Sequence, residues 1–330
     1  MVAASTRSSF GHAGGAGIRI LEPVSENIAA CAVALRSGEL VGMPTETVYG
    51  IAADALNEDA VRRTFEIKGR PSDNPVIVHL PSVDHVLRVV EAWSPTAQAL
   101  AQRFWPGPIT LVMTKRADVS DAVTAGLSTV AVRVPSHPVA LELLARADVP
   151  ISAPSANRFT GLSPTAAGEI DPAIGDHLFA ILDGGACRVG IESTVVDVSG
   201  ETPRILRPGG VSRAQIEEVV GPLAPLDLDR PRMSPGMYPR HYAPRTPVRC
   251  VEHLSEMDSG LCFGVPGNPF QIQLPNEPEA YATGLYSALH RLDLEDRPEI
   301  AIEAPPLGPE WEAVWDRLRK AGCSYPISNG

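Results

Sequence analysis

Apolar residues follow two kinds of spacing over residues 18–221, one typical of helices and one typical of strands. Helical spacing starts after Ser25, which is placed to cap a helix stopped by Gly38, and again after a cap at Asn57, in a helix ending at Lys68 before Gly69. Short buried or alternating runs lie between such stretches, a pattern typical of an α/β domain of about 200 residues. The expected strands are 40–43, 76–80, 109–113, 129–134, 149–152, 179–182, 193–198 and 204–206, with helical stretches at 83–93, 97–104 and 138–146.

The pattern changes at both ends of this domain. Residues 1–17 are rich in Ala, Ser and Gly and are expected to form a disordered tail. Prolines are dense over 222–247, which predicts an extended, semi-rigid linker without regular structure. Beyond it, strand-like runs at 248–251 and 261–265 and helical stretches at 280–292 and 311–320 predict a small α/β domain over 248–330.

Composition narrows the function classes. The 330 residues carry a net charge of −11, which disfavours a generally basic nucleic-acid surface. No run approaches the roughly eighteen apolar residues of a membrane helix. The five cysteines are widely spaced and form no CxxC, which argues against a disulfide scaffold and a structural zinc site. These features favour a cytoplasmic protein.

Strand parity places two polar side chains together. In the strand at 76–80, Ile77 and His79 share one face, and in the strand at 129–134 the face that carries Arg133 is opposite to its valines. Such a face either lines a cleft or is solvated, and parity alone does not decide between them.

Several loops carry groups suited to a phosphate ligand. PTETVYG, residues 44–50, brings three hydroxyl groups and the Glu46 carboxylate to the carboxyl end of a strand, although a turn with satisfied hydroxyls is favoured for one such motif taken alone. In KGRPSDNP, Lys68 and Arg70 offer an ammonium and a planar guanidinium, or else they offset the dipole of a helix C-terminus. No GxxxxGK[ST] is present, so a P-loop is excluded.

Two later segments add neutral hydrogen-bonding groups. SAPSANRFTGLSPT, residues 152–165, supplies Ser155 and Asn157, and its Ser163–Pro164 pair is expected to open a helix. GIESTVVDVS and RILRPGG offer Ser193 and Arg207. Together, the loops suit a nucleoside triphosphate beside a small zwitterion, with catalysis by positioning and charge neutralisation.

These motifs, in this order, resemble one known family. PTETVYG, KGRP, NP, WPGP, VRVPSHP, APSAN, SPT, ESTVVD and RPG follow each other as in the YrdC-type threonylcarbamoyl-AMP synthases, and SPGMYPRHYAP before a small domain is similar to their longer two-domain form. The resemblance implies a twisted, mixed α/β sheet with a concave cavity, plus a small C-terminal α/β domain. It also implies synthesis of L-threonylcarbamoyl-AMP and pyrophosphate from L-threonine, bicarbonate and ATP, the first step of the N6-threonylcarbamoyladenosine modification of tRNA.

The resemblance further implies roles for individual residues. Mg²⁺ would be held mainly by the phosphates, and a separate threonylcarbamoyl-transferase complex would act on tRNA. Arg240 would close over the nucleotide together with two neighbours in the linker. The implied catalytic residues are Lys68, Arg70, Ser155 and Asn157; those for ATP are Arg70, Asn74, Thr129, Ser155, Ser163, Arg207, His241 and Tyr242; those for threonine are Thr47, His79, Arg133, Ala153 and Ser193.

Two other functions remain open at this point. The concave face is also compatible with an RNA-binding module that carries out no adenylate chemistry, although no aromatic platform for RNA is evident. Carbamoyl transfer from carbamoyl phosphate is a third possibility, but the accessory acylphosphatase and zinc-finger segments of such proteins are absent.

Overall fold

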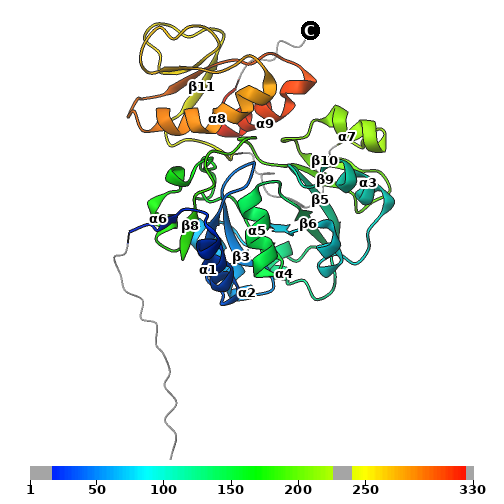
Figure 1. Ribbon diagram of the computed structural model, residues 1–330. Helices are drawn as coiled ribbons and strands as arrows, with labels where there is room; N and C mark the ends of the chain where they lie inside the picture. Colours follow the sequence, from blue (N-terminus) through cyan, green and yellow to red (C-terminus); the bar gives the residue numbers. More distant parts are fainter. Residues whose placement is uncertain (1–16, 226–239, 325–330) are drawn as a thin grey trace, which may run out of the picture.

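The structure is a computed structural model that describes residues 17–225 and 240–324. In this part of the chain, ten strands form one mixed sheet in the order β1-β8-β2-β3-β7-β4-β6-β5-β9-β10 (Figure 1). The strands are β1 Ile20–Leu21, β2 Val41–Met43, β3 Gly50–Asp54, β4 Ile77–His79, β5 Ile109–Thr114, β6 Thr129–Arg133, β7 Ile151–Ser152, β8 Ala180–Leu182, β9 Thr194–Asp197 and β10 Arg204–Arg207. The predicted α/β class and mixed sheet are confirmed.

Helices flank this sheet and begin near the expected residues. Asn57 caps the second helix by accepting the Ala60 backbone N–H at 3.1 Å, and Gly69 ends it at φ +62°. Ser25 is the first helical residue rather than the cap, because its hydroxyl accepts a hydrogen bond from Arg146. The helices are α1 Ser25–Arg36, α2 Glu58–Lys68, α3 Pro95–Phe104, α4 Asp121–Thr124, α5 Pro138–Ala147, α6 Pro172–Gly175 and α7 Arg213–Val220, with 3₁₀ turns at Val83–Arg88 and Ala167–Glu169.

Two strands of the central sheet, β1 and β3, lie outside the predicted set. β3 pairs antiparallel with β2, so that Met43 lies opposite Gly50 and residues 44–49 form the loop of a hairpin. Four of the five β3 residues are buried. Burial on both faces gives no alternation of polar and apolar residues, which hides such a strand in the sequence.

The two faces of the sheet differ as strand parity predicts. Val78 and Val132 belong to the largest apolar cluster, which also contains Phe65 of α2 and Leu100 of α3. On the opposite face, a smaller cluster packs Ile77 and Ala131 with residues of β5, β9 and β10. This second face is buried rather than solvated, because Arg133 is only 3% exposed. The choice that parity left open is therefore settled in favour of an enclosed face.

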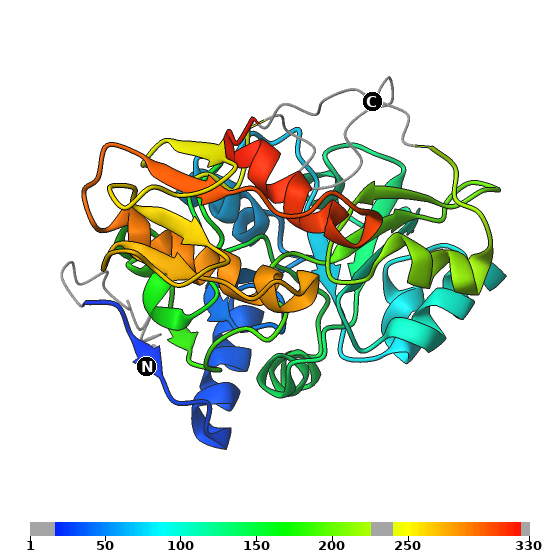
Figure 2. The same cartoon turned by 90° about the horizontal axis from the view of Figure 1, so that it is seen from above.

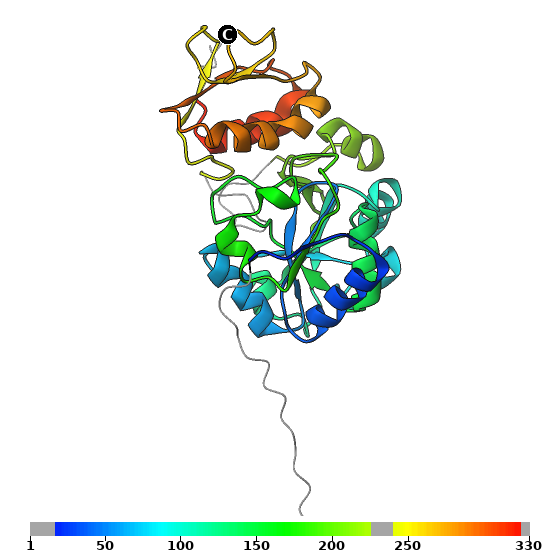
Figure 3. The same cartoon turned by 60° about the vertical axis from the view of Figure 1, so that its left-hand side comes forward.

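The C-terminal domain is a smaller, parallel α/β unit. Its strands pair in the order β11-β14-β12-β13. Figures 1 and 3 show its two long helices on the side that faces the larger domain, and Figure 2 shows the smaller domain lying over the larger one. Its elements are β11 Val248–Val251, β12 Gly260–Cys262, β13 Gln271–Gln273, β14 Ile300–Glu303, α8 Pro278–Asp293 and α9 Glu312–Ala321, with a 3₁₀ turn at Pro309–Trp311.

The connection between the domains is described in part. Residues 222–225 and 240–247 contain no helix or strand, as their prolines predict. The expectation for residues 226–239, and that for the tail over residues 1–16, lie outside the described residues. Among the described helices, none combines the length and apolarity needed to cross a bilayer.

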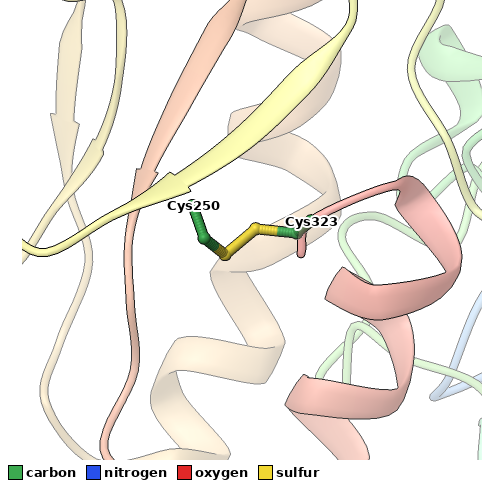
Figure 4. The surroundings of a disulfide bond; sticks show 2 residues. All are labelled: Cys250 and Cys323. Carbon is green, nitrogen blue, oxygen red and sulfur yellow. A yellow bond between two sulfur atoms is a disulfide. The ribbon is translucent and has the colours of Figure 1, made fainter. Parts of the chain in front are cut away.

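One cysteine pair corrects the expectation from cysteine spacing. Cys250 in β11 and Cys323, just beyond α9, form a disulfide (Figure 4). They are 73 residues apart in the sequence, and only the fold brings the end of α9 against β11. Cys31, Cys187 and Cys262 are buried free thiols, and the described residues contain no cluster of three metal-ligating side chains.

The disulfide is expected to stabilise the C-terminal domain. A cross-link that closes a loop of this length restricts the unfolded chain and contributes roughly 4 kcal/mol. We expect Cys250→Ser to lower the free energy of unfolding of this domain by that amount in urea titrations without reductant. Excess reductant is expected to lower the value for the wild type equally and to leave the variant unchanged. Equal stability of wild type and variant would contradict this assignment.

Candidate functional site

Segments from both halves of the central sheet, and from the linker, enclose one small cavity. Its volume is about 50 Å³, which is room for a few water molecules. The walls come from the β2–β3 hairpin loop, from β4 and β6, from the loops around residues 153–155 and 192–193, and from the linker. The lining residues are Thr45, Thr47, Val48, Gly50, Arg70, Ile77, His79, Arg133, Ala153, Pro154, Ser155, Glu192, Ser193, Arg207, His241 and Tyr242.

Most of the residues expected from the sequence meet in this lining, but five lie outside it. Lys68, Asn74, Asn157 and Ser163 are buried without lining the cavity. Thr129 starts β6 on the same face as Arg133, four residues away, which is about 13 Å along a strand. The structure therefore does not bring Thr129 to the cavity.

Lys68 is the last residue of α2, Arg70 follows the C-cap Gly69, and both side chains are buried. The Lys68 ammonium donates to the carbonyls of Ser155 and Asn157, and so ties α2 to the loop that carries them. Burial, reinforced by the charge of Arg70, holds the pKa of Lys68 well below its ordinary value. Arg70 donates to the carbonyls of Asn74 and Pro75. Both cations stabilise the loops around them, and Arg70 also lines the cavity.

Two buried amides have polar atoms that lack hydrogen-bond partners among the described residues. Neither the amide oxygen nor the amide nitrogen of Asn74 has one, although the residue is fully buried. The side-chain amide nitrogen of Asn157 donates to the carbonyls of Arg158 and Gly161, while its side-chain oxygen Oδ1 has no hydrogen-bond partner among the described residues. Buried polar groups are nearly always paired in proteins, so such atoms point to a ligand.

Arg133 is held by the hairpin loop rather than standing alone. Its guanidinium forms an ion pair with Glu46 at 2.7 Å and donates to the Thr47 hydroxyl at 2.9 Å. Burial raises the pKa of Glu46, but the charge and hydrogen bond of Arg133, together with backbone hydrogen bonds, outweigh this effect, so the pKa lies below its ordinary value. The sequence singled out Arg133 and the Glu46 carboxylate separately, but no local pattern predicted that they pair.

Ser193 and Arg207 lie together where β9 and β10 meet. Arg207 donates to the Ser193 carbonyl at 2.9 Å and to its hydroxyl at 3.2 Å, and the same hydroxyl lies 2.8 Å from that of Thr110. Arg207 also approaches the Tyr242 hydroxyl at 3.5 Å. Two residues that were singled out from separate motifs are thus neighbours in the fold.

Glu192 is the further functional candidate that sequence reasoning missed. It lines the cavity, is almost fully buried, and accepts a hydrogen bond from the Ser163 hydroxyl at 2.6 Å. Ser163 and Pro164 do not open a helix, because this hydroxyl is directed to Glu192 rather than to a backbone N–H. Burial raises the pKa of Glu192, but Arg317 and Arg207 outweigh it and lower the pKa to about 2.

A short strap from the linker, residues 240–247, closes one side of the cavity. The His241 backbone N–H donates to the Lys320 carbonyl at 3.0 Å, and Ala243 bridges to Gly161. Tyr242 is fully buried at φ +59°, a left-handed conformation that is uncommon for a bulky residue. The side chains of His241 and Tyr242 line the cavity, whereas Arg240 is exposed and does not.

Comparisons of the chain with known protein families and relatives agree with the fold and the site geometry. A family model described as "Telomere recombination", covering Sua5, YciO and YrdC sequences, matches residues 33–209. A second, described as "Threonylcarbamoyl-AMP synthase, C-terminal domain", matches residues 211–323. The threonylcarbamoyl-AMP synthase of Pyrococcus abyssi is 39% identical over 329 residues, which cover 92% of this chain and 96% of that protein. The chain belongs to the Sua5/YciO/YrdC family.

Other relatives extend the match to the whole two-domain architecture. The threonylcarbamoyl-AMP synthase of Bacillus subtilis is 38% identical over 319 residues, covering 89% of this chain and 92% of the relative. The crystal structure of P. abyssi Sua5 complexed with L-threonine has a TM-score of 0.83 at 35% identity and covers 93% of this chain and 98% of that one. E. coli YciO, at 20% identity and a TM-score of 0.51, shares the fold over 58% of this chain.

The two buried histidines of the cavity predict a dependence of stability on pH. Burial lowers the pKa of His79 and that of His241 to about 3, with Arg133 adding to the effect at His79. Between about pH 6.5 and 3 the unfolded chain therefore binds more protons at these residues, and stability falls as the pH falls. We expect each to contribute about 2 kcal/mol to the loss between pH 7 and pH 5.

The contribution of His79 to the pH dependence of stability is measured by urea unfolding at pH 7 and at pH 5. The variant His79→Asn is expected to lose less stability than the wild type between pH 7 and 5, while His177→Asn, at a residue exposed on the surface, is expected to behave as wild type. An unchanged loss in His79→Asn would show that this imidazole is not buried in its neutral form.

Proposed function

We propose that this chain is an enzyme that synthesises L-threonylcarbamoyl-AMP and pyrophosphate from L-threonine, bicarbonate and ATP. The single observation that carries the proposal is the convergence of Arg70, Arg133 and Arg207 on one buried cavity, with Lys68 directly behind its wall. A triphosphate beside an amino acid is an anionic ligand pair that such a group of cations neutralises. The names of the full-length relatives support the same reaction.

The nucleotide half of the site is proposed to surround Lys68 and Arg70. Arg70, Arg207 and the strap line the same cavity, and Asn74 supplies two buried polar atoms suited to a ligand. Thr129 remains a proposed contact only if the nucleotide extends along β6. The proposed contacts are Lys68, Arg70, Asn74, Ser155, Asn157, Ser163, Arg207, His241 and Tyr242.

The amino-acid half is proposed to lie around Arg133 and the β2–β3 loop. The Thr45 hydroxyl donates to the Val48 carbonyl, so in its contact with Thr47 it can only accept. The Thr47 hydroxyl therefore donates to Thr45, and it also accepts a hydrogen bond from Arg133. Thr47 therefore offers only an acceptor, which suits the amine of threonine. The Ala153 N–H donates to the Ile77 carbonyl, so a main-chain contact with the ligand falls to the Ala153 carbonyl oxygen. His79 and Ser193 complete the proposed pocket, with Arg133 facing the carboxylate.

The proposed reaction has two steps. The threonine amine adds to bicarbonate and expels water, which gives a carbamate. A carbamate oxygen then attacks the α-phosphorus of ATP in line, the bond from that phosphorus to the bridging oxygen breaks, and pyrophosphate leaves with the electron pair. Positioning of the two reactants and neutralisation of the phosphate charge by Lys68, Arg70 and Arg207 lower the barrier. A carbamate decomposes in water, so the site has to exclude solvent.

Mg²⁺ is proposed to enter with ATP rather than to bind a site built by the chain. Within the described residues, Glu192 is the one carboxylate that lines the cavity, and it is already paired with Arg317 and Ser163. Mg²⁺ in nucleotide sites is typically held by phosphates, waters and one or two carboxylates. The ion would supply further charge neutralisation on the phosphates.

The linker is proposed to act as a lid. Ligand pockets usually measure about 300–1,000 Å³, whereas this cavity measures about 50 Å³. His241 and Tyr242 must therefore move outward to admit ATP and can then close over it. We accordingly propose residues 18–221 as the catalytic domain, 222–247 as the linker and lid, and 248–330 as the C-terminal domain.

The surroundings of the reaction follow from its chemistry. The product is a mixed anhydride that hydrolyses readily, so a separate transferase acting on tRNA is proposed to consume it, and the reaction is placed in the cytoplasm. The Cys250–Cys323 disulfide is unusual for that compartment. Direct RNA binding is less well supported, because the candidate residues are buried around a small cavity and the net charge is −11.

The proposal is tested by detecting the product. Purified protein with L-threonine, bicarbonate, ATP and Mg²⁺ is expected to yield an adenylate of the mass of threonylcarbamoyl-AMP, and omission of any substrate is expected to abolish it. Arg70→Ala and Lys68→Ala are each expected to slow pyrophosphate release roughly a hundredfold or more, because charge on the phosphates is no longer neutralised.

Arg62→Ala is the matched control, since Arg62 lies on the same helix and is exposed to solvent. It is expected to retain wild-type turnover. Absence of the adenylate from the wild-type reaction would refute the proposed activity. Near-normal turnover of Arg70→Ala and Lys68→Ala would remove them from the catalytic group while leaving the activity in place.

A further inference from the structure

The C-terminal domain reaches the cavity through one buried ion pair. Arg317 of α9 is 1% exposed, and its Nε donates to Glu192 Oε2 at 2.8 Å. Its terminal nitrogen also donates to the Pro208 carbonyl at 2.9 Å, next to Arg207. From α8, the Tyr286 hydroxyl donates to the same carboxylate oxygen at 3.1 Å. Arg317 also pairs with Asp316 at 2.7 Å, and Asp316 pairs in turn with Lys320 at 2.6 Å. Glu192 therefore faces the cavity with its charge matched by the cations of α9.

Contacts from the C-terminal domain also reach Ser163 and Tyr242, two residues proposed to bind the nucleotide. The other Glu192 oxygen accepts the Ser163 hydroxyl, and His290 of α8 lies 3.2 Å from the Ser163 carbonyl. The Arg317 guanidinium lies 4.9 Å from the centre of the Tyr242 ring, and the Tyr286 ring stacks on Tyr242 at 6.1 Å. A cation over an aromatic face is attractive, and the attraction is stronger when the pair is buried.

Charge explains why this arrangement matters to a triphosphate. A bare carboxylate in the wall of a buried cavity repels phosphate strongly, because the surroundings screen charge poorly. Pairing with Arg317 cancels that charge and leaves Glu192 as an oriented acceptor for Ser163. Removing one partner of a buried pair leaves the other uncompensated, which is far more costly than the pair itself is favourable.

We propose that Arg317 and Tyr286 are positioning residues of the nucleotide half of the site, supplied by the C-terminal domain. They neutralise and orient Glu192, which fixes Ser163, and they support the ring of Tyr242 in the strap. The cavity lining comes from the catalytic domain and the linker, while the C-terminal domain holds Glu192 and Tyr242 in place from behind. This inference rests on the proposed function, because it assumes that the cavity takes ATP.

The inference is tested on the full-length protein with Arg317→Met, which removes the charge and keeps a long side chain. We expect the KM for ATP to rise roughly tenfold or more, while the KM for L-threonine changes by less than about twofold. The double variant Arg317→Met/Glu192→Gln no longer carries a bare carboxylate, and its affinity for ATP is expected to recover most of the loss. Arg319→Met is the matched control, since Arg319 lies on the same helix and is exposed.

Direct ATP binding by calorimetry separates this inference from the proposed reaction. If the wild type binds ATP but forms no adenylate, the reaction is refuted, and the dissociation constants of the variants still test the positioning role. Wild-type affinity in Arg317→Met, or a double variant as weak as the single one, would overturn the inference. Failure of the wild type to bind ATP would overturn both.

A second variant guards against misfolding of Arg317→Met, which thermal unfolding would reveal. Tyr286→Phe removes only the hydroxyl that donates to Glu192 and keeps the ring stacked on Tyr242. It is expected to weaken ATP binding by a smaller factor, about threefold, because Arg317 still neutralises Glu192 and the ligand feels the lost hydrogen bond only indirectly. An unchanged dissociation constant in this variant would contradict the role assigned to Tyr286.

Discussion

The burial of charge is the constraint on which the rest of this structure depends. Four cations, Lys68, Arg70, Arg133 and Arg207, are withdrawn from water within one region. Each needs oxygen atoms in compensation, because an uncompensated buried charge is costly. The compensation comes from loop carbonyls for Lys68 and Arg70, from Glu46 for Arg133, and from Ser193 for Arg207. The loops therefore take the courses that bring these oxygens inward.

This constraint links stability to function. The cations that organise the loops are also those expected to contact the phosphate and carboxylate groups of the substrates. A bound ligand would therefore replace or supplement the protein oxygens that now accept hydrogen bonds from these cations. The lowered pKa values of Lys68 and of the two cavity histidines follow from the same burial. Glu192 would oppose an anionic ligand, and its pairing with Arg317 resolves that conflict by using the second domain. The C-terminal domain is therefore part of the electrostatics of the site.

Features that depend on neighbouring residues were predictable from the sequence. The Asn57 cap, the Gly69 stop and the shared face of His79 and Arg133 follow from local spacing alone. Family resemblance added the linker residues His241 and Tyr242, which the structure places in the lining. The lid motion and the individual roles of the site residues stay predictions.

Features that depend on distant residues were not predictable in this way. Arg317 and Glu192 are 125 residues apart, and the disulfide joins cysteines 73 residues apart, so no local pattern signals either pair. Ser163 was expected to begin a helix, because a Ser–Pro pair favours that locally, but a buried carboxylate from another segment took its hydroxyl. Thr129 lies on the expected face, yet too far along its strand to reach the cavity.

The most direct measurement of the central claim is a crystal structure of the full-length protein with L-threonine and a non-hydrolysable ATP analogue. We expect the triphosphate to contact Lys68, Arg70 and Arg207 in an enlarged cavity, the threonine carboxylate to contact Arg133, and the Glu192–Arg317 pair to remain intact beside Ser163. Ligands bound elsewhere on the molecule, with the cavity still closed at about 50 Å³, would contradict the account.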